Sequence, residues 1–188
     1  MSARRSAGRA RSRGTHAWWA AFALCATVTA ASAVAAGARL EQLPQSWRDD
    51  DGRTLELRAL GGRRVILTMA YAGCHRFCPL TLARLERMQQ ALDGRGEQAE
   101  FVVIGYDPET EKAADWHAYR ASRHLERGNW HFHLGSRQDT EVLARQLGFD
   151  FWKYDEHVMH GMRALIFDER GAVQAVLGPE TNDWVRAL

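Results

Sequence analysis

The sequence predicts an α/β domain with a central mixed sheet flanked by helices. Two apolar runs, 65–71 and 101–105, have the length and composition of buried strands. Each is followed by a stretch in which apolar residues recur at helical spacing. Two further apolar segments flank Glu169-Arg170-Gly171 and indicate a hairpin. Alternating strands and helices that end in a hairpin imply a sheet with both parallel and antiparallel pairs.

Turn-forming residues divide the first half of the domain into elements. The expected turns lie at Asp50–Gly52, Gly61–Gly62, Asp93–Gly94 and Asp107–Pro108. Alternation predicts a short strand over 54–57, and the apolar run after the double glycine predicts a buried strand over 64–71. A helix is expected over 79–92 because its leucines recur on one face. The second buried strand, 101–105, then ends at the Asp-Pro turn.

The second half continues the alternation and closes with the hairpin. In order, the expected elements are a helix over 109–126, a strand over 130–134, a helix over 138–147, hairpin strands over 163–168 and 172–177, and a short helix from 179. Trp116 and Tyr119 are expected to face the core from the first of these helices, and Leu143 and Leu147 from the second. This order fits a thioredoxin-like fold in one domain, 47–188.

The N-terminal segment has the pattern of an export signal. A basic head without acidic residues carries Arg4, Arg5, Arg9, Arg11 and Arg13. An uncharged stretch, 17–36, follows, and small-residue cleavage sites are present at 31–33 and 36–38. We therefore expect 1–38 to be a signal peptide or an N-terminal membrane anchor, and 39–46 to be a linker. The domain would then be periplasmic, either free or tethered to the inner membrane.

Charge and cysteine content change once the leader is set aside. Of 25 basic residues, 5 lie in the leader, so 20 remain against 23 acidic ones. The slight basicity of the whole chain therefore gives no reason to expect a nucleic-acid partner. Cys25 also lies in the leader, which leaves Cys74 and Cys78 as the only cysteines of the exported part. In an oxidising compartment such a pair is a disulfide, a redox couple or a metal site.

The two cysteines lie where a buried strand gives way to a helix, in the stretch Cys74-His75-Arg76-Phe77-Cys78-Pro79. On helical geometry, β-carbons four residues apart lie about 5–6 Å from each other, close enough to share a metal ion. Pro79 suits the first position of a helix, so Cys78 would lie at the positive end of the helix dipole, which favours its thiolate. A disulfide that closes so short a loop stabilises a fold little, which favours a functional role for the pair.

These residues resemble the Sco/SenC family of thioredoxin-fold, exported or membrane-tethered proteins. The resemblance begins with 70–74 and Cys78-Pro79, and it extends over most of 47–178. It includes Asp107-Pro108 after the second strand, and His160 just before the hairpin. It implies that Cys74, Cys78 and His160 bind copper, as Cu(I), Cu(II) or both.

The function implied by the resemblance is that of a copper metallochaperone. Its client would be the copper centre of cytochrome c oxidase or another cuproprotein, and it would not be an enzyme in the sense of turnover. The alternative, also known in the family, is a thiol–disulfide oxidoreductase. This protein would use Cys74 and Cys78 as a redox-active pair to keep client cysteines reduced, with thiol reductant proteins as further partners. Contact with the membrane would occur only through the N-terminal segment.

The donor set itself agrees with copper, because thiolates and an imidazole are soft to borderline ligands. The chain nevertheless departs from the family pattern at two places. His75-Arg76-Phe77 stands between the cysteines, and Met159 stands where a carboxylate usually precedes the histidine. Either His75 or Met159 could add a further ligand, and His157 competes with His160 for the role of the histidine ligand.

Two other metal interpretations are weaker. His131 and His133 form a His-x-His pair, but the alternation of 130–134 is also that of a half-buried strand with polar residues outward, which we favour. A structural zinc site normally needs four protein ligands, and the sequence offers three together. The spacing of the two cysteines also differs from the CxxC motif of thioredoxin-like reductases, which argues mildly against the redox alternative.

Overall fold

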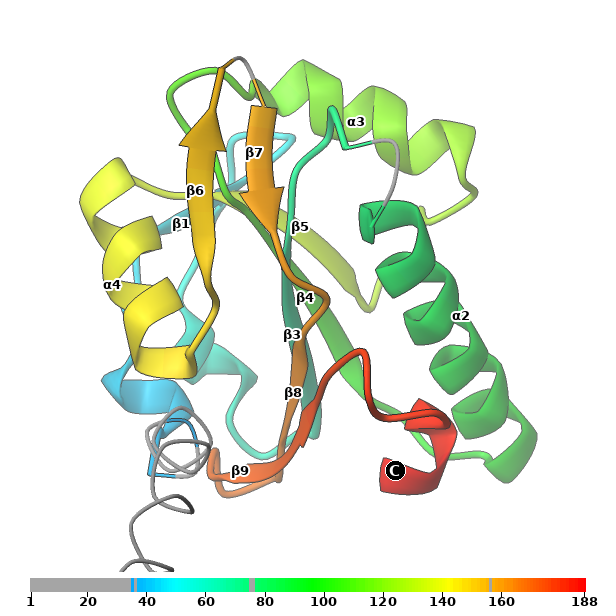
Figure 1. Ribbon diagram of the computed structural model, residues 1–188. Helices are drawn as coiled ribbons and strands as arrows, with labels where there is room; N and C mark the ends of the chain where they lie inside the picture. The colour runs from blue at the N-terminus through cyan, green and yellow to red at the C-terminus, as the bar shows by residue number, and fades with distance from the viewer. Residues whose placement is uncertain (1–34, 36, 75–76, 156) are drawn as a thin grey trace, which may run out of the picture.

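A seven-stranded mixed sheet forms the centre of the protein (Figure 1). The computed structural model describes residue 35 and residues 37–74, 77–155 and 157–188. Along the sheet the strands are β2 (Thr54–Leu55), β1 (Trp47–Asp49), β5 (Trp130–Leu134), β4 (Glu100–Gly105), β3 (Val65–Ala70), β8 (Ala164–Phe167) and β9 (Val173–Leu177). The helices are α2 (Phe77–Arg95), α3 (Ala113–Ser122) and α4 (Arg137–Leu147), with 3-10 turns η1 (Leu40–Gln42), η2 (Leu57–Leu60) and η3 (Trp184–Ala187). The predicted α/β class, with a central mixed sheet flanked by helices, is confirmed.

The fully buried strand β3 carries the chain to the cysteines. All six of its residues are buried, as its continuous apolar sequence predicts. It pairs in parallel with β4 and antiparallel with β8. A parallel neighbour in the same sheet needs a crossover connection, and α2 supplies it. The end of β3 and the start of α2 are therefore fixed at one edge of the sheet.

The two faces of the sheet are covered by different helices (Figure 1). On one face, apolar residues of α2, α3 and η3 pack on the sheet, among them Leu82, Leu85, Met88, Trp116 and Trp184. On the other face, residues of η1, η2 and α4 do so, among them Leu40, Leu57, Leu143 and Leu147. The expected inward residues Trp116, Leu143 and Leu147 are buried. The result is a layer of sheet between two apolar cores.

Two helices and one strand have boundaries that differ from those expected. Helix α2 begins at Phe77, so Pro79 lies within the first turn and not at its first position. This costs no intrahelical hydrogen bond, because the first four N–H groups of a helix have no partner within it. Helix α3 is shorter than the predicted 109–126, because the N–H groups of Thr110 and Glu111 bond to the carbonyl of Asp107 in a separate turn. The strand expected over 54–57 stops at Leu55, before η2.

A second, two-stranded sheet was missed by the sequence analysis. It consists of β6 (Phe151–Tyr154) and β7 (His157–His160), paired antiparallel. The strands are short, and β6 has no buried residue, so its sequence lacks the alternation that marks a half-buried strand. This hairpin matters for function because it ends at His160.

The N-terminal predictions concern residues that the structure describes only in part. Of the predicted leader, 1–38, residues 1–34 and 36 lie outside the described residues. The segment 39–46, expected as a linker, contains η1, and Leu40 and Leu43 are buried in the core. The N–H of Leu40 also donates to the carbonyl of Gly171. Within the described part of the chain, no helix is both long enough and apolar enough to span a bilayer.

The histidines of β5 differ from expectation. Strand β5 lies between β4 and β1 inside the sheet, and His133 is only 2 % exposed. Neither ring nitrogen of His133 has a hydrogen-bond partner, whereas His131 Nε2 lies 2.7 Å from Glu100 Oε2. The expectation that both histidines point outward is wrong for His133. Burial, with the neighbouring His131 charge, lowers the pKa of His133 to about 4.

This buried histidine predicts a pH-dependent term in stability. The pKa of His133 is lowered from 6.5 to about 4 in the folded state, so the unfolded state binds more protons between these values. Stability from this group is therefore lost as pH falls from 6.5 towards 4. The free energy of unfolding of the wild type, minus that of His133→Leu, should fall by about 3 kcal/mol over this range. Urea unfolding of both proteins at several pH values measures it, and an equal pH dependence of the wild type and His133→Leu would contradict the prediction.

Candidate metal centre

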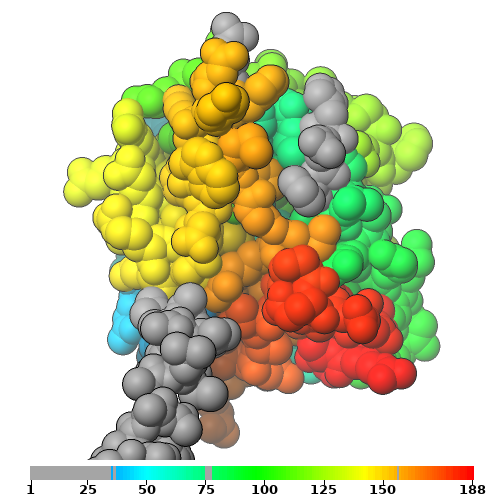
Figure 2. Space-filling model, in the orientation of Figure 1, coloured from blue at the N-terminus to red at the C-terminus, as the bar shows by residue number. Residues whose placement is uncertain are grey.

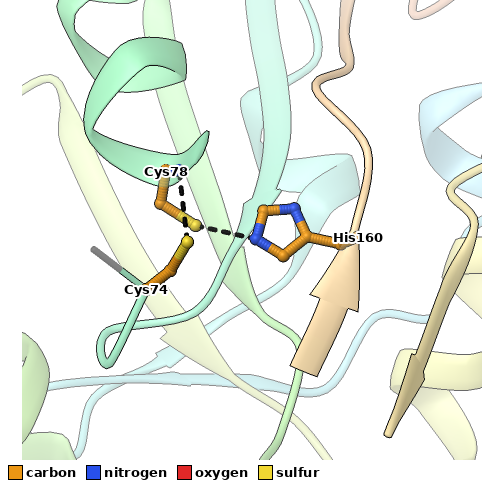
Figure 3. Close-up of side chains that lie close together, drawn as sticks. All are labelled: Cys74, Cys78 and His160. Carbon is orange, nitrogen blue, oxygen red and sulfur yellow. Dashed lines mark hydrogen bonds between the residues drawn. The ribbon is translucent and has the colours of Figure 1, made fainter. Parts of the chain in front are cut away.

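The two thiols meet where β3 passes into α2. Cys74 lies in the connecting loop and is half-buried, and its N–H donates to the carbonyl of Tyr71 in a tight turn. Cys78 lies in the first turn of α2 and is 1 % exposed. The Cys78 N–H lies 3.5 Å from the Cys74 sulfur, to which it donates. The helix start therefore positions both sulfurs on its inner side (Figure 3).

His160 reaches the thiols from β7. Side chains alternate along this strand, so Val158 and His160 are buried while His157 and Met159 are exposed. The His160 Nε2 atom lies 3.1 Å from the Cys78 sulfur. Among the described histidines, cysteines and carboxylates, Cys74, Cys78 and His160 form the one group with three ligand atoms within 4.8 Å of one another. Figure 3 shows the imidazole facing the two sulfurs from the opposite side.

The orientation of the imidazole is fixed without a carboxylate. His160 Nδ1 lies 2.9 Å from the carbonyl oxygen of Gly161. A carbonyl oxygen can only accept, so Nδ1 donates to Gly161, and Nε2 is the ring nitrogen that faces the Cys78 sulfur. Tyr106 stacks on the ring, with centroids 4.7 Å apart. The carbonyl of Gly161 thus orients the imidazole. A carboxylate just before the histidine, where this chain has Met159, would have the same role.

The electrostatics of Cys78 correct the expectation from the helix dipole. The N–H of Tyr71 donates to the Cys78 sulfur at 3.2 Å, which favours the thiolate. The hydrogen bond with Cys74 and burial act more strongly, and together they raise the pKa of the Cys78 thiol far above its usual value. Cys78 therefore keeps its proton, and its sulfur lies 3.1 Å from His160 Nε2. A soft metal ion would take the place of that proton.

Glu111, which the sequence analysis missed, braces the loop that carries Cys74. Its buried carboxyl group accepts from the N–H of Ala72 at 2.6 Å and from the N–H of Asp107 at 3.0 Å. Burial raises the pKa of Glu111 to about 7. The Asp107 carboxylate in turn pairs with Lys153 of β6 at 3.0 Å. A continuous polar chain thus joins the loop before Cys74, the loop after β4 and the hairpin that carries His160.

Nothing in the sequence marks Glu111 as buried, because it follows an Asp-Pro turn in a polar stretch. The other candidate ligands are not brought to the thiols. His157 and Met159 lie on the exposed face of β7, opposite to His160. Met159 therefore does not supply the fourth contact that we had considered. His75 lies outside the described residues, and the His-x-His pair of β5 does not belong to the three-ligand group.

The fold and the site together define a class of protein: an α/β domain with a Cys-Cys-His donor set at the start of a helix. The family model described as SCO1/SenC matches residues 36–186. The chain therefore belongs to the SCO1/SenC family, and the predicted family is confirmed. Its solved neighbours have the same fold, which confirms that the domain is thioredoxin-like.

Individual relatives are distant in sequence. The chain is 24 % identical over 102 residues to the SCO1 protein homolog of Bacillus subtilis (strain 168), a match that covers 54 % of this chain and 53 % of the relative. The matched part thus spans about half the length of that relative. The copper-bound ScoI structure of Arabidopsis thaliana is similar with a TM-score of 0.67 and 22 % identity, over 78 % of this chain and 89 % of that one. The structure of BsSco, described with a disulfide switch and as a member of the Sco family of cytochrome c oxidase assembly proteins, has a TM-score of 0.68 and 21 % identity, over 80 % of this chain and 90 % of that one.

The bracing role of Glu111 predicts a clear stability difference between neighbouring glutamates. Glu111→Ala removes the acceptors of two N–H groups and should lower the free energy of unfolding by about 1–3 kcal/mol. Glu109→Ala, two residues away at an exposed position, should change it by less than about 0.5 kcal/mol. Urea unfolding of both variants measures the difference. Equal stabilities would show that the Glu111 carboxyl group does not support the loop.

Proposed function

We propose that this protein binds one copper ion through Cys74, Cys78 and His160 and delivers it to a cuproprotein client. The observation that carries the proposal is the convergence of three soft or borderline donor atoms, within 4.8 Å of one another, from a loop, a helix start and a strand. Two sulfurs and one imidazole suit copper, and three protein ligands leave a coordination position open for transfer. A closed structural zinc site would need a fourth ligand.

The two cysteines have different parts in this function. Cys78 is buried and bonded to the Tyr71 N–H and to His160, so it is the anchoring ligand. Cys74 is half-buried in a loop, so a ligand of the client can reach its side of the ion first. Copper would then leave by stepwise ligand exchange, in which a client sulfur or imidazole replaces Cys74 before the other two ligands are released.

The comparisons support this function but leave the client open. A structure of Arabidopsis ScoI contains copper, and BsSco belongs to a family described as cytochrome c oxidase assembly proteins. We propose a cytochrome c oxidase subunit, or another cuproprotein, as the client, and copper bound as Cu(I), Cu(II) or both. The basic head and uncharged stretch of the leader support export to the periplasm, free or tethered to the inner membrane.

A second candidate function is the reduction of client disulfides. The thiols of Cys74 and Cys78 are hydrogen-bonded to each other, and BsSco is described with a disulfide switch. The Cys74 thiolate would attack a client disulfide, and one client thiolate would leave. The Cys78 sulfur would then lose its proton to solvent and attack Cys74, which releases the second client thiolate and leaves the pair oxidised. A thiol reductant protein would have to restore the pair.

His160 discriminates between the two functions. His160→Ala should weaken Cu(I) binding by at least about 100-fold, since even outer-shell changes cost 10–100-fold. Thiol–disulfide exchange needs only the sulfurs and should continue. Competition with a calibrated Cu(I) chelator, under reducing and oxygen-free conditions, measures the affinity. His157→Ala is the matched control, and a loss of tight binding there, with His160→Ala unchanged, would show that the wrong histidine was chosen.

The raised pKa of the Cys78 thiol predicts that copper binding releases protons. Because Cys78 is a thiol at neutral pH and must ionise to bind the metal, the apparent Cu(I) affinity should rise with pH. We expect a slope of at least about one in log affinity per pH unit between pH 6 and 8. Calorimetric titration in two buffers with different protonation enthalpies counts the released protons directly. An affinity independent of pH would contradict a protonated Cys78.

A further inference from the structure

The outer face of the β6–β7 hairpin carries an unusual set of exposed side chains. We call this set the outer hairpin face, and it consists of Trp152, Tyr154, His157 and Met159. Among the described residues, Trp152 is the one exposed tryptophan, at 57 %, and Met159 the one exposed methionine, at 40 %. The other described tryptophans and methionines are buried in the two cores. Figure 2 shows the hairpin, coloured yellow to orange, on the face turned to the viewer.

The pairing of the strands places these four side chains together. Trp152 is directly opposite Met159, and Tyr154 is directly opposite His157. Cross-strand partners have β-carbons about 4.5–5.5 Å apart. His157 and Met159 are two residues apart on one strand, so their β-carbons lie about 7 Å apart on the same face. A thioether, an imidazole and an indole ring therefore border a single patch of surface.

The chemistry of this patch suits a soft monovalent cation. Thioether sulfur selects Cu(I) among biological metals, and an imidazole is a common partner ligand for it. The face of an indole ring attracts a cation that lies over it. We propose that the outer hairpin face is a second, weaker Cu(I) site, with His157 and Met159 as ligands and the Trp152 ring beside the ion. This inference rests on the proposed copper function.

The position of the second site suggests that it captures copper for the first. Met159 and His160 are consecutive residues on opposite faces of β7, so one strand separates the exposed site from the buried one. In the transfer, the bonds from Cu(I) to the Met159 sulfur and the His157 nitrogen break. Bonds to the sulfurs of Cys74 and Cys78 and to His160 Nε2 form, and the thiol protons pass to solvent. Copper remains Cu(I), so no electron donor or acceptor is needed.

The test removes the tight site and titrates the remaining one. In Cys25→Ser/Cys74→Ser/Cys78→Ser, which has no thiol left, a titration with Ag(I), a redox-inert soft cation, should show one site and quench the fluorescence of Trp152. His157→Gln and Met159→Leu in this background should each weaken Ag(I) binding by at least tenfold. Matched controls, His117→Gln at another exposed histidine and Met162→Leu at a buried methionine, should leave it unchanged. Affinities within twofold for all four variants would overturn the proposal.

A second measurement does not depend on the folding of the cysteine-free variant. In the intact reduced protein, labelled at its methionine methyl groups, Cu(I) beyond the first equivalent should shift the NMR signal of Met159 and not that of Met162. A Met159 signal that stays in place through three equivalents would overturn the proposal. If Trp152→Ala blocks copper transfer to a client while His157→Gln and Met159→Leu leave Ag(I) affinity intact, the face is a protein docking surface and the metal site is wrong.

The same measurements separate this inference from the proposed function. If His160→Ala loses tight Cu(I) binding and the Met159 signal does not move, the proposed second site is contradicted and the proposed function is supported. If His160→Ala binds Cu(I) as tightly as the wild type and the Met159 signal moves, the proposed Cys-Cys-His site is contradicted and the proposed outer site is supported.

Discussion

The contact between the Cys78 sulfur and the His160 imidazole joins parts of the chain that are 82 residues apart, and the site depends on it. The sheet makes this contact possible, because β3 leads into the helix of Cys78 and its neighbour β8 begins just after the hairpin of His160. The segment between β7 and β8 is held on both sides. The Thr68 hydroxyl donates to the Arg163 carbonyl at 2.6 Å, and the Arg163 guanidinium donates to the Leu147 carbonyl at 3.0 Å. His160 is therefore positioned by the core and not by a mobile loop.

Much of this arrangement could be predicted from the sequence. The apolar runs of β3, β4 and β8 are long and unambiguous, and the cysteines at the end of β3 mark the site. The hairpin of β6 and β7 could not be predicted, because an exposed two-stranded sheet has no apolar alternation to reveal it. The burial of Glu111 could not be predicted either. Its hydrogen bonds are made to backbone groups of two loops, and a sequence pattern carries no information on where loop N–H groups point.

The helix dipole and the burial of Cys78 illustrate how two physical effects compete. The position at a helix start suggested an acidic thiol, and the N–H of Tyr71 does favour the thiolate. A thiol that is almost fully enclosed and hydrogen-bonded to a second sulfur nevertheless keeps its proton. In the apo protein the Cys78 sulfur already lies against the His160 ring, so the donor set is assembled before any metal arrives. The reduced pair is thereby poorly reactive at its inner sulfur, whereas the outer sulfur of Cys74 remains accessible.

Because side chains alternate along β7, the register of the hairpin decides which residues face the thiols. In the observed register, His160 turns towards the thiols while Met159 and His157 turn to solvent. A slip of one residue in the pairing of β6 with β7 would exchange these faces, because successive side chains of a strand point in opposite directions. His160 would then face solvent, and the thioether of Met159 would face the sulfurs. The observed register is thus what gives the Cys-Cys-His group an imidazole, and a shift of two residues would restore the facing that a shift of one destroys.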